Sequence, residues 1–177
     1  MAKKNKSGVM ENEILKVMRL DKDAELPEYA LDCDVALDLR ANEEAMLEPM
    51  EQKEIKTGVA IEIPEGYIGL VRDRAGIITK MGIHVVAGTF NSAYRGEVSV
   101  FMINFSGEEV NIEKGMRIAQ MIVVPINKLK IEEVKSLSKT QRSGKEIGHT
   151  GLNEMLSALN ELAAQGDKKM GKGKKGK

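Results

Sequence analysis

Short apolar runs separated by turn residues fill the chain from Ile14 to Val134, and no other feature constrains the fold as strongly. Segment 59–63 (Val-Ala-Ile-Glu-Ile) alternates in polarity, and 64–66 (Pro-Glu-Gly) then turns the chain into the next apolar run. Alternation every second residue with frequent Gly, Pro, Asn and Asp turns is typical of a β-sandwich or barrel. The sequence therefore predicts an all-β domain over residues 14–137.

Two later segments strengthen this prediction. Residues 98–102 (Val-Ser-Val-Phe-Met) alternate again, and 118–125 (Ile-Ala-Gln-Met-Ile-Val-Val-Pro) form a continuous apolar run suited to a strand buried on both faces. A chain of 177 residues is long enough for one domain with a full core and short for two.

Composition narrows the partners and the compartment. Lysine plus arginine and aspartate plus glutamate number 27 each, so no overall field favours nucleic acid or an anionic membrane as the main partner. The single cysteine, Cys33, cannot form an intrachain disulfide, and we expect a buried free thiol in a reducing cytoplasm. No run approaches the roughly 18 apolar residues of a membrane span.

The two ends of the chain differ from the β region. Residues 1–13 are expected to form a flexible N-terminus, and the polar, glycine-rich segment 138–151 a flexible arm. Leucines and a methionine at helical spacing predict an amphipathic helix over 152–164, acting as a lid or an oligomer contact. The lysine- and glycine-rich tail 165–177 is expected to be disordered, with weak nonspecific nucleic-acid contact as the alternative to a solubilising role.

Five motifs follow in a specific order: 36–41 (Ala-Leu-Asp-Leu-Arg-Ala), 73–76 (Asp-Arg-Ala-Gly), 88–96 (Gly-Thr-Phe-Asn-Ser-Ala-Tyr-Arg-Gly), 115–120 (Gly-Met-Arg-Ile-Ala-Gln) and 142–151 (Arg-Ser-Gly-Lys-Glu-Ile-Gly-His-Thr-Gly). Together they resemble the motifs of trimeric dUTPases. The resemblance implies a distorted jelly-roll or β-barrel fold of the β-clip type and a homotrimer with sites between subunits. It also implies Mg²⁺-assisted hydrolysis of dUTP to dUMP and pyrophosphate, by attack of water on the α-phosphate.

The resemblance assigns the phosphate and metal residues. Asp38 matches the carboxylate that holds magnesium through water, and Arg74 and Gln120 match residues near the phosphates. Gly76 would let the backbone approach the phosphates closely, whereas Ala75 stands where the family usually has serine. Such a site needs a divalent cation and fork-shaped arginines because a triphosphate carries several negative charges. The plainer alternatives are a turn-capping Asp38 and a salt bridge between Arg74 and Asp73.

The hairpin from Gly88 to Gly96 resembles the one that reads uracil through main-chain groups, with Tyr94 packed against the deoxyribose. Asn91 stands where the family has the aspartate that activates water. An amide accepts a hydrogen bond but takes no proton, and general-base assistance contributes about 10²–10⁴-fold. We therefore expect binding to survive and turnover to be impaired.

In the arm, Arg142 matches the arginine that clamps the terminal phosphate, and Gly148 belongs to the phosphate-cradling pattern. Ile147 replaces a phenylalanine that stacks on uracil. His84 and His149 have no metal-ligand spacing and are expected to be structural or adjacent to phosphate.

Two other functions remain open. A catalytically weak dUTP-binding or regulatory homologue is favoured by Ala75, Asn91 and Ile147 together. A dCTP deaminase of the same fold is disfavoured because Phe101 stands where that branch has a proton-shuttling glutamate. A purely structural β-domain is the weakest alternative.

Overall fold

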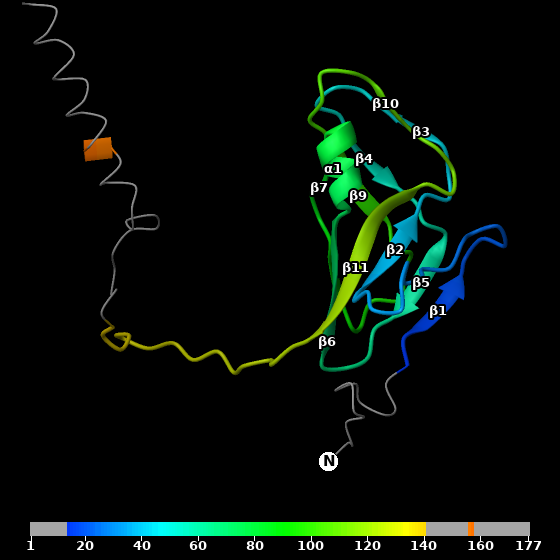
Figure 1. Ribbon diagram of the computed structural model, residues 1–177. Coiled ribbons are helices and arrows are strands. Elements are labelled where there is room, and N and C mark those ends of the chain that lie inside the picture. Colours follow the sequence, from blue (N-terminus) through cyan, green and yellow to red (C-terminus); the bar gives the residue numbers. More distant parts are fainter. Residues whose placement is uncertain (1–13, 141–155, 158–177) are drawn as a thin grey trace, which may run out of the picture. The chain divides into compact units, whose positions relative to one another are not determined.

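The computed structural model describes residues 14–140 and 156–157 (Figure 1). It has two compact units, Met1–Leu129 and Lys130–Lys177, and all the strands lie in the first. The elements are β1 (Lys16–Arg19), β2 (Ala36–Arg40), β3 (Ala45–Leu47), β4 (Gln52–Ile55), β5 (Val59–Glu62), β6 (Tyr67–Asp73), α1 (Ala75–Met81), β7 (Ile83–Val85), β8 (Thr89–Asn91), β9 (Val100–Asn104), β10 (Val110–Ile112) and β11 (Arg117–Pro125).

The strands pair antiparallel in separate sheets. One sheet has the order β2-β11-β6-β8 and another β4-β9-β7, and two smaller sheets pair β1 with β5 and β3 with β10. The predicted β architecture is confirmed, but the sheets of the described residues do not close into a barrel. β11 lies between β2 and β6, so it joins the strands that carry two of the predicted motifs (Figure 1).

Aliphatic side chains fill the core, as expected for a chain with 3% aromatic residues. Val98, Val100 and Met102 are at most 1% exposed, which confirms the predicted alternation along this segment. The run from Ile118 is buried through Met121 apart from half-buried Gln120, but Pro125 is exposed. β11 is therefore covered on both faces only over its first half.

A short helix interrupts the all-β pattern. α1 buries Ile77 and ends at Gly82, whose φ of 69° lies in the left-handed region that favours glycine. Two adjacent isoleucines and a threonine within seven residues favour strand over helix by propensity. The helix escaped prediction because its stability comes from burying Ile77 and from contacts with β7.

Several other expectations meet the structure here. Cys33 is exposed, so the prediction of a buried thiol was wrong; it lies in a loop before β2 with no core to enter. Residues 138–140 have no regular structure, and the rest of the predicted arm, the N-terminus 1–13 and the tail 165–177 lie outside the described residues. Of the predicted helix 152–164, only residues 156–157 are described, and both are helical. No helix within the described part of the chain could cross a membrane.

Candidate functional site

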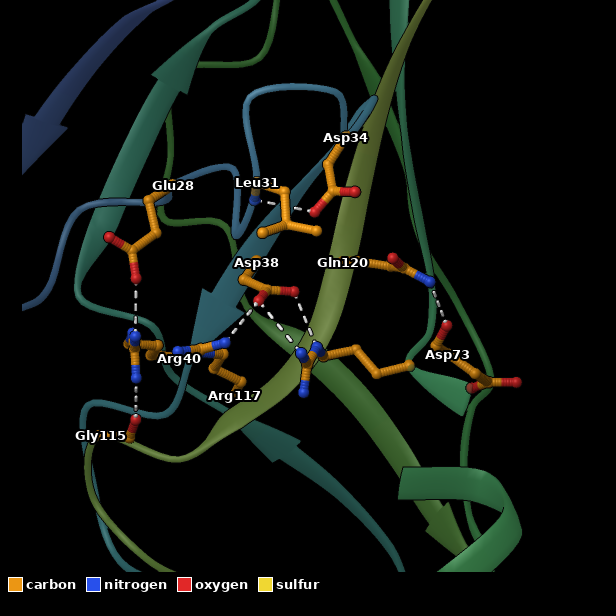
Figure 2. Close-up of polar contacts among 10 residues, drawn as sticks. Glu28, Leu31, Asp34, Asp38, Arg40, Asp73, Gly115, Arg117 and Gln120 are labelled. Carbon is orange, nitrogen blue, oxygen red and sulfur yellow. Dashed lines mark hydrogen bonds and ion pairs between the residues drawn. The ribbon is translucent and has the colours of Figure 1, made fainter. Parts of the chain in front are cut away.

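Asp38, in the middle of β2, holds a group of charged side chains together (Figure 2). Arg74 donates from Nε to Oδ1 at 2.7 Å and from Nη2 to Oδ2 at 3.1 Å, and Arg117 Nη1 lies 3.4 Å from Oδ2. The Asp38 residue is only 5% exposed. A two-point contact fixes the plane of a guanidinium. Asp38, the predicted metal residue, and Arg74, a predicted phosphate residue, are therefore in direct contact within one chain.

The neighbouring strand β11 supplies Arg117 and Gln120. Its pairing with β2 shifts register between Arg117 and Ala119, an irregularity that bends a strand locally and re-aims its side chains. Gln120 then lies opposite Asp38 in the ladder. Its Nε2 donates to the main-chain oxygen of Asp73 at 2.7 Å, which ties β11 to the end of β6 (Figure 2).

Asp73 has partners of its own, so the alternative of an Asp73–Arg74 salt bridge is not what the structure shows. Its Oδ2 lies 2.7 Å from Nδ1 of His84, and its Oδ1 accepts a hydrogen bond from the main-chain N–H of Val85 at 2.6 Å. These contacts join the end of β6 to β7. The Asp73 carboxylate therefore binds His84 and Val85, and Arg74 binds Asp38 instead. The acidic partner of His84 was not predicted from the sequence.

Arg74, Ala75 and Gly76 lie where β6 passes into α1. Arg74 is the N-cap residue, with extended backbone angles and no side-chain cap hydrogen bond. Ala75 and Gly76 are exposed, and a Cβ added to Gly76 would meet no atom within 4 Å. Open space therefore adjoins Gly76 in this chain.

A pocket of about 440 Å³ lies on the hairpin formed by β8 and the following turn. It contains the three hairpin residues assigned to the site from the sequence together with four residues that were not assigned to it. The lining residues are Ala87, Gly88, Thr89, Phe90, Asn91, Tyr94 and Phe101.

Close contacts hold this hairpin in place. The oxygen of Gly88 accepts a hydrogen bond from Val71 N–H at 2.7 Å, and a Cβ added to Gly88 would lie 2.6 Å from the Val71 oxygen. The Tyr94 hydroxyl donates to the Glu97 oxygen at 2.9 Å, and its ring meets Phe90 edge-on with centroids 5.6 Å apart. Tyr94 is therefore fixed beside the pocket although 43% of it is exposed.

The two groups of residues lie toward opposite ends of β6. Asn91 pairs with Ile68 near the start of the strand, whereas Arg74 follows its last residue, Asp73. Six residues at roughly 3.3 Å each place the two positions about 20 Å apart along the strand. The predicted site residues therefore form two separate groups in one chain. The first group is Asp38, Arg74 and Gln120, and the second is Gly88, Asn91 and Tyr94.

The residues around Asp38 fit a magnesium ion bound through water, but they do not provide enough protein ligands to bind one directly. No group of three or more His, Cys, Asp or Glu side chains that could hold a metal occurs in the described parts of the chain. Mg²⁺ usually keeps several waters and is bound through one or two carboxylates and the phosphates of a substrate. A lone carboxylate whose oxygens retain acceptor capacity beside two arginines fits this water-mediated role, and does not fit a cage made of protein ligands alone.

Three predicted arm residues, Arg142, Ile147 and Gly148, lie outside the described residues. Conversely, sequence reasoning assigned neither Phe90 nor Phe101 to the site as a pocket wall. The signal was present for Phe101, because it alternates with the buried Val100 and Met102 and must face away from the core.

Comparison with known proteins extends these observations. A family model described as dUTPase matches residues 22–151. The deoxyuridine 5'-triphosphate nucleotidohydrolase of Hydrogenobaculum sp. is 45% identical over 141 residues, covering 78% of this chain and 98% of that protein.

Solved structures of dUTPases share the fold. The dUTPase of Staphylococcus bacteriophage 80alpha with dUpNHpp matches with a TM-score of 0.76 and 30% identity, over 80% of this chain and 100% of that one. Its description states that phage dUTPases control transfer of virulence genes. A mutant dUTPase from phage phi11 of S. aureus, described with a structural Mg(II) ion, matches with a TM-score of 0.66 and 28% identity, over 70% of this chain and 98% of that one. The predicted β-clip jelly roll is thereby confirmed.

Proposed function

This chain belongs to the dUTPase family, and we propose that it hydrolyses dUTP to dUMP and pyrophosphate with the two groups of residues described above. The observation that carries the proposal is the convergence of three motifs far apart in sequence: Arg74 binds Asp38, and Gln120 lies opposite Asp38 in the strand ladder. Gln120 also donates to the main-chain oxygen of Asp73, the residue before Arg74. The family match spans these motifs and the hairpin. A common site explains why all of them are present.

We assign the triphosphate to the group around Asp38. Two arginines face one carboxylate there, so the group keeps an excess of positive charge that attracts phosphate oxygens. Arg74 is 29% and Arg117 39% exposed at the side chain, so both can reach a ligand without leaving Asp38. Preorganised donors of this kind stabilise the negative charge that develops at the α-phosphate.

Magnesium is the cofactor that we propose for this group, with Asp38 holding it through water. When bound, Mg²⁺ neutralises phosphate charge and orients the triphosphate. The support is the lone carboxylate beside the arginines and the structural Mg(II) ion described for the phage phi11 protein. Asp38 itself would keep Arg74 and Arg117 in place whether or not the ion is present.

We assign deoxyuridine to the hairpin pocket, with Tyr94 against the sugar and main-chain groups around Gly88 facing the base. A fixed pattern of donors and acceptors rejects cytosine because a mismatched base leaves buried polar groups unpaired. Asn91 lines the same pocket, and its amide oxygen can accept a hydrogen bond from the attacking water. It cannot take the proton, so positioning and electrostatics carry the reaction.

A complete site requires more than one chain in this proposal. Asn91 and Arg74 are about 20 Å apart along β6, farther than a nucleotide's α-phosphate can be from both the attacking water and its own clamp. Head-to-tail contacts in a closed ring bring different faces of neighbouring subunits together. A homotrimer with shared sites therefore fits the division of residues, and Arg142, Ile147 and Gly148 would complete each site from the arm.

We also infer a cytoplasmic location. Cys33 is a free and exposed thiol, which persists best in a reducing compartment. The equal numbers of basic and acidic residues in the chain give no reason to propose a specific nucleic-acid partner.

The test is an incubation of the full chain with dUTP or dCTP and Mg²⁺, following pyrophosphate and ammonia. Pyrophosphate from dUTP alone is expected, at a rate lowered by Asn91. Ammonia from dCTP would instead identify a deaminase. Phe101 argues against that activity because the phenyl ring at the pocket can neither accept nor donate a proton. Binding of neither nucleotide would overturn the proposal.

A regulatory function is the second candidate, and two observations favour it. Asn91 lines the pocket where a proton acceptor would be needed, and a similar phage protein is described as controlling transfer of virulence genes. Tight binding of dUpNHpp without release of pyrophosphate from dUTP would support this candidate over an enzyme with useful turnover.

A further inference from the structure

Aromatic side chains are concentrated at the hairpin pocket. The chain has three phenylalanines, three tyrosines and no tryptophan, and half of these six aromatic residues, namely Phe90, Tyr94 and Phe101, line this one pocket. Phe90 packs against the aliphatic core, whereas Tyr94 and Phe101 do not belong to it. The concentration therefore points to a planar ligand.

Two of the three rings already have partners in the protein. Phe90 and Tyr94 meet edge-on at 5.6 Å, and the Tyr94 hydroxyl is bound to the Glu97 oxygen. In addition, a Cβ at Gly96 would lie 2.5 Å from that hydroxyl, so a side chain at position 96 would displace the Tyr94 ring. Phe90 and Tyr94 thus act as a fixed unit of the hairpin.

Phe101 differs because no other ring within residues 14–140 pairs with it. It is 37% exposed, whereas Val100 and Met102 on either side are fully buried. An exposed phenyl ring does not gain the free energy of burying its apolar surface unless a ligand or another part of a protein packs against it. The exposed ring faces a pocket, so a ligand in that pocket would provide the cover.

The backbone fixes this ring relative to the hairpin. β9 pairs with β4 on one side, with Phe101 opposite Glu54, and with β7 on the other. The Phe101 oxygen also accepts a hydrogen bond from Val86 N–H at 3.0 Å, just before the pocket residues Ala87 and Gly88. A residue inside a strand that is hydrogen-bonded to a neighbouring strand on each side has a fixed backbone, so the direction of its side chain is fixed as well.

We propose that Phe101 is a substrate-binding residue whose ring packs against the nucleobase and forms the apolar wall of the base pocket. This inference rests on the proposed function, because it requires the base to occupy the hairpin pocket. Aromatic–base stacking is worth about 5- to 150-fold in affinity when the ring is removed. Phe101 contributes to the binding of deoxyuridine nucleotides and takes no part in proton transfer.

The first experiment compares dissociation constants for dUpNHpp with Mg²⁺, by calorimetry on the full chain. Phe101→Ala is expected to weaken binding by about 5- to 150-fold and Phe101→Leu by a smaller factor. Phe105→Ala is the matched control, since Phe105 is a more exposed phenylalanine just beyond the same strand and does not line the pocket. It should stay within about twofold of the parent protein. Unchanged affinity in Phe101→Ala, or in Phe101→Leu, would overturn the stacking role.

The second experiment uses the absence of tryptophan from the chain. Phe101→Trp places a single fluorophore at the proposed wall, and Phe105→Trp places one outside the pocket. dUMP should change the emission of the first variant in a saturable manner and leave the second unchanged. Tripolyphosphate, which has no base, should leave both unchanged. An unresponsive Phe101→Trp variant that binds dUMP by calorimetry would overturn the inference even if Phe101→Ala fails to fold.

The two proposals fail in different ways. If the unmodified chain binds neither dUpNHpp nor dUMP, the proposed function is wrong and this inference falls with it. If the unmodified chain binds both and the Phe101 variants bind equally well, only the role of Phe101 is wrong.

Discussion

Asn91 is the residue at which the proposed chemistry of this chain departs most from that of its family. Its side chain lines the pocket at the end of β8, and its main-chain oxygen accepts a hydrogen bond from Tyr94 N–H at 3.0 Å. The backbone at this position is therefore fixed by the turn and does not depend on the side-chain functional group. A single change of amide to carboxylate can test the chemistry with the hairpin intact.

We expect Asn91→Asp to raise the rate of pyrophosphate release from dUTP by at least about tenfold, because a carboxylate can take the proton from the attacking water. The affinity for dUpNHpp should change much less. Asn111→Asp makes the same exchange at an exposed position of β10 outside this pocket and should leave the rate unchanged. An equal rate in the Asn91 variant would mean that the proton acceptor lies elsewhere or that another step is slow.

Asp38 gives a second prediction at the scale of the residue. Asp38→Asn leaves Arg74 and Arg117 without their anionic partner, and an amide N–H would face one of the guanidinium groups. Because both arginines reach solvent, we expect a loss of about 1–2 kcal/mol in the free energy of unfolding, below the cost for a fully buried pair. Urea denaturation measures this loss. Asp32→Asn, at an exposed position, should show none.

At the scale of the elements, strands were predictable and their partners were not. The alternation in 59–63 and 98–102 identifies β5 and β9, and Val59, Ile61, Val98, Val100 and Met102 are buried as it predicts. Ala60 and Ser99 are buried as well, which the alternation did not predict. The pairing of Gln120 with Asp38 depends on a register shift in β11 that leaves no mark in hydrophobic periodicity. Contacts such as Asp38 with Arg74 therefore became visible only in three dimensions.

The hairpin of β8 depends on close approach of two backbones. Gly88→Ala would place a methyl group 2.6 Å from the Val71 oxygen, so the hairpin must move away from β6. We expect about 1–3 kcal/mol of destabilisation and weaker binding of dUpNHpp, measured by urea denaturation and calorimetry. Gly107→Ala, where an added Cβ meets nothing within 4 Å, should change neither quantity.

Glu28 links the segment before β2 to that strand through an ion pair with Arg40, and the strength of this ion pair depends on pH. Arg40 donates a hydrogen bond to the Glu28 carboxylate at 2.7 Å, which lowers the pKa of Glu28 below its usual value. A lowered folded-state pKa stabilises the protein above the unfolded-state pKa, and this contribution disappears as pH falls through the folded-state value. Glu28→Gln should therefore be less stable than the parent near neutral pH and equal to it in strong acid. Thermal unfolding at several pH values checks this, with Glu65→Gln as the exposed control.

At the scale of the whole molecule, the resemblance implied sites shared between subunits, and the residues that match the motifs lie in two separate groups within one chain. Motifs reveal which residues share a function, but the 20 Å between Asn91 and Arg74 follows from strand geometry alone. The arm residues, including Arg142, lie outside the described part of the chain, so their contribution stays a prediction. In the proposed mechanism, assembly of a trimer brings the two groups of residues together.

A mixing experiment tests whether neighbouring chains complete each other's sites. Arg74→Ala damages one half-site and Tyr94→Ala the other, so each variant alone should be nearly inactive in pyrophosphate release from dUTP. In a ring assembled at random from equal amounts of both, a site that draws its halves from adjacent chains is intact with a probability of about one quarter. Co-refolded mixtures should therefore recover about a quarter of the parent activity, in particles with three times the chain mass of 19.5 kDa. A site built within one chain would recover nothing, since every chain then carries a damaged half.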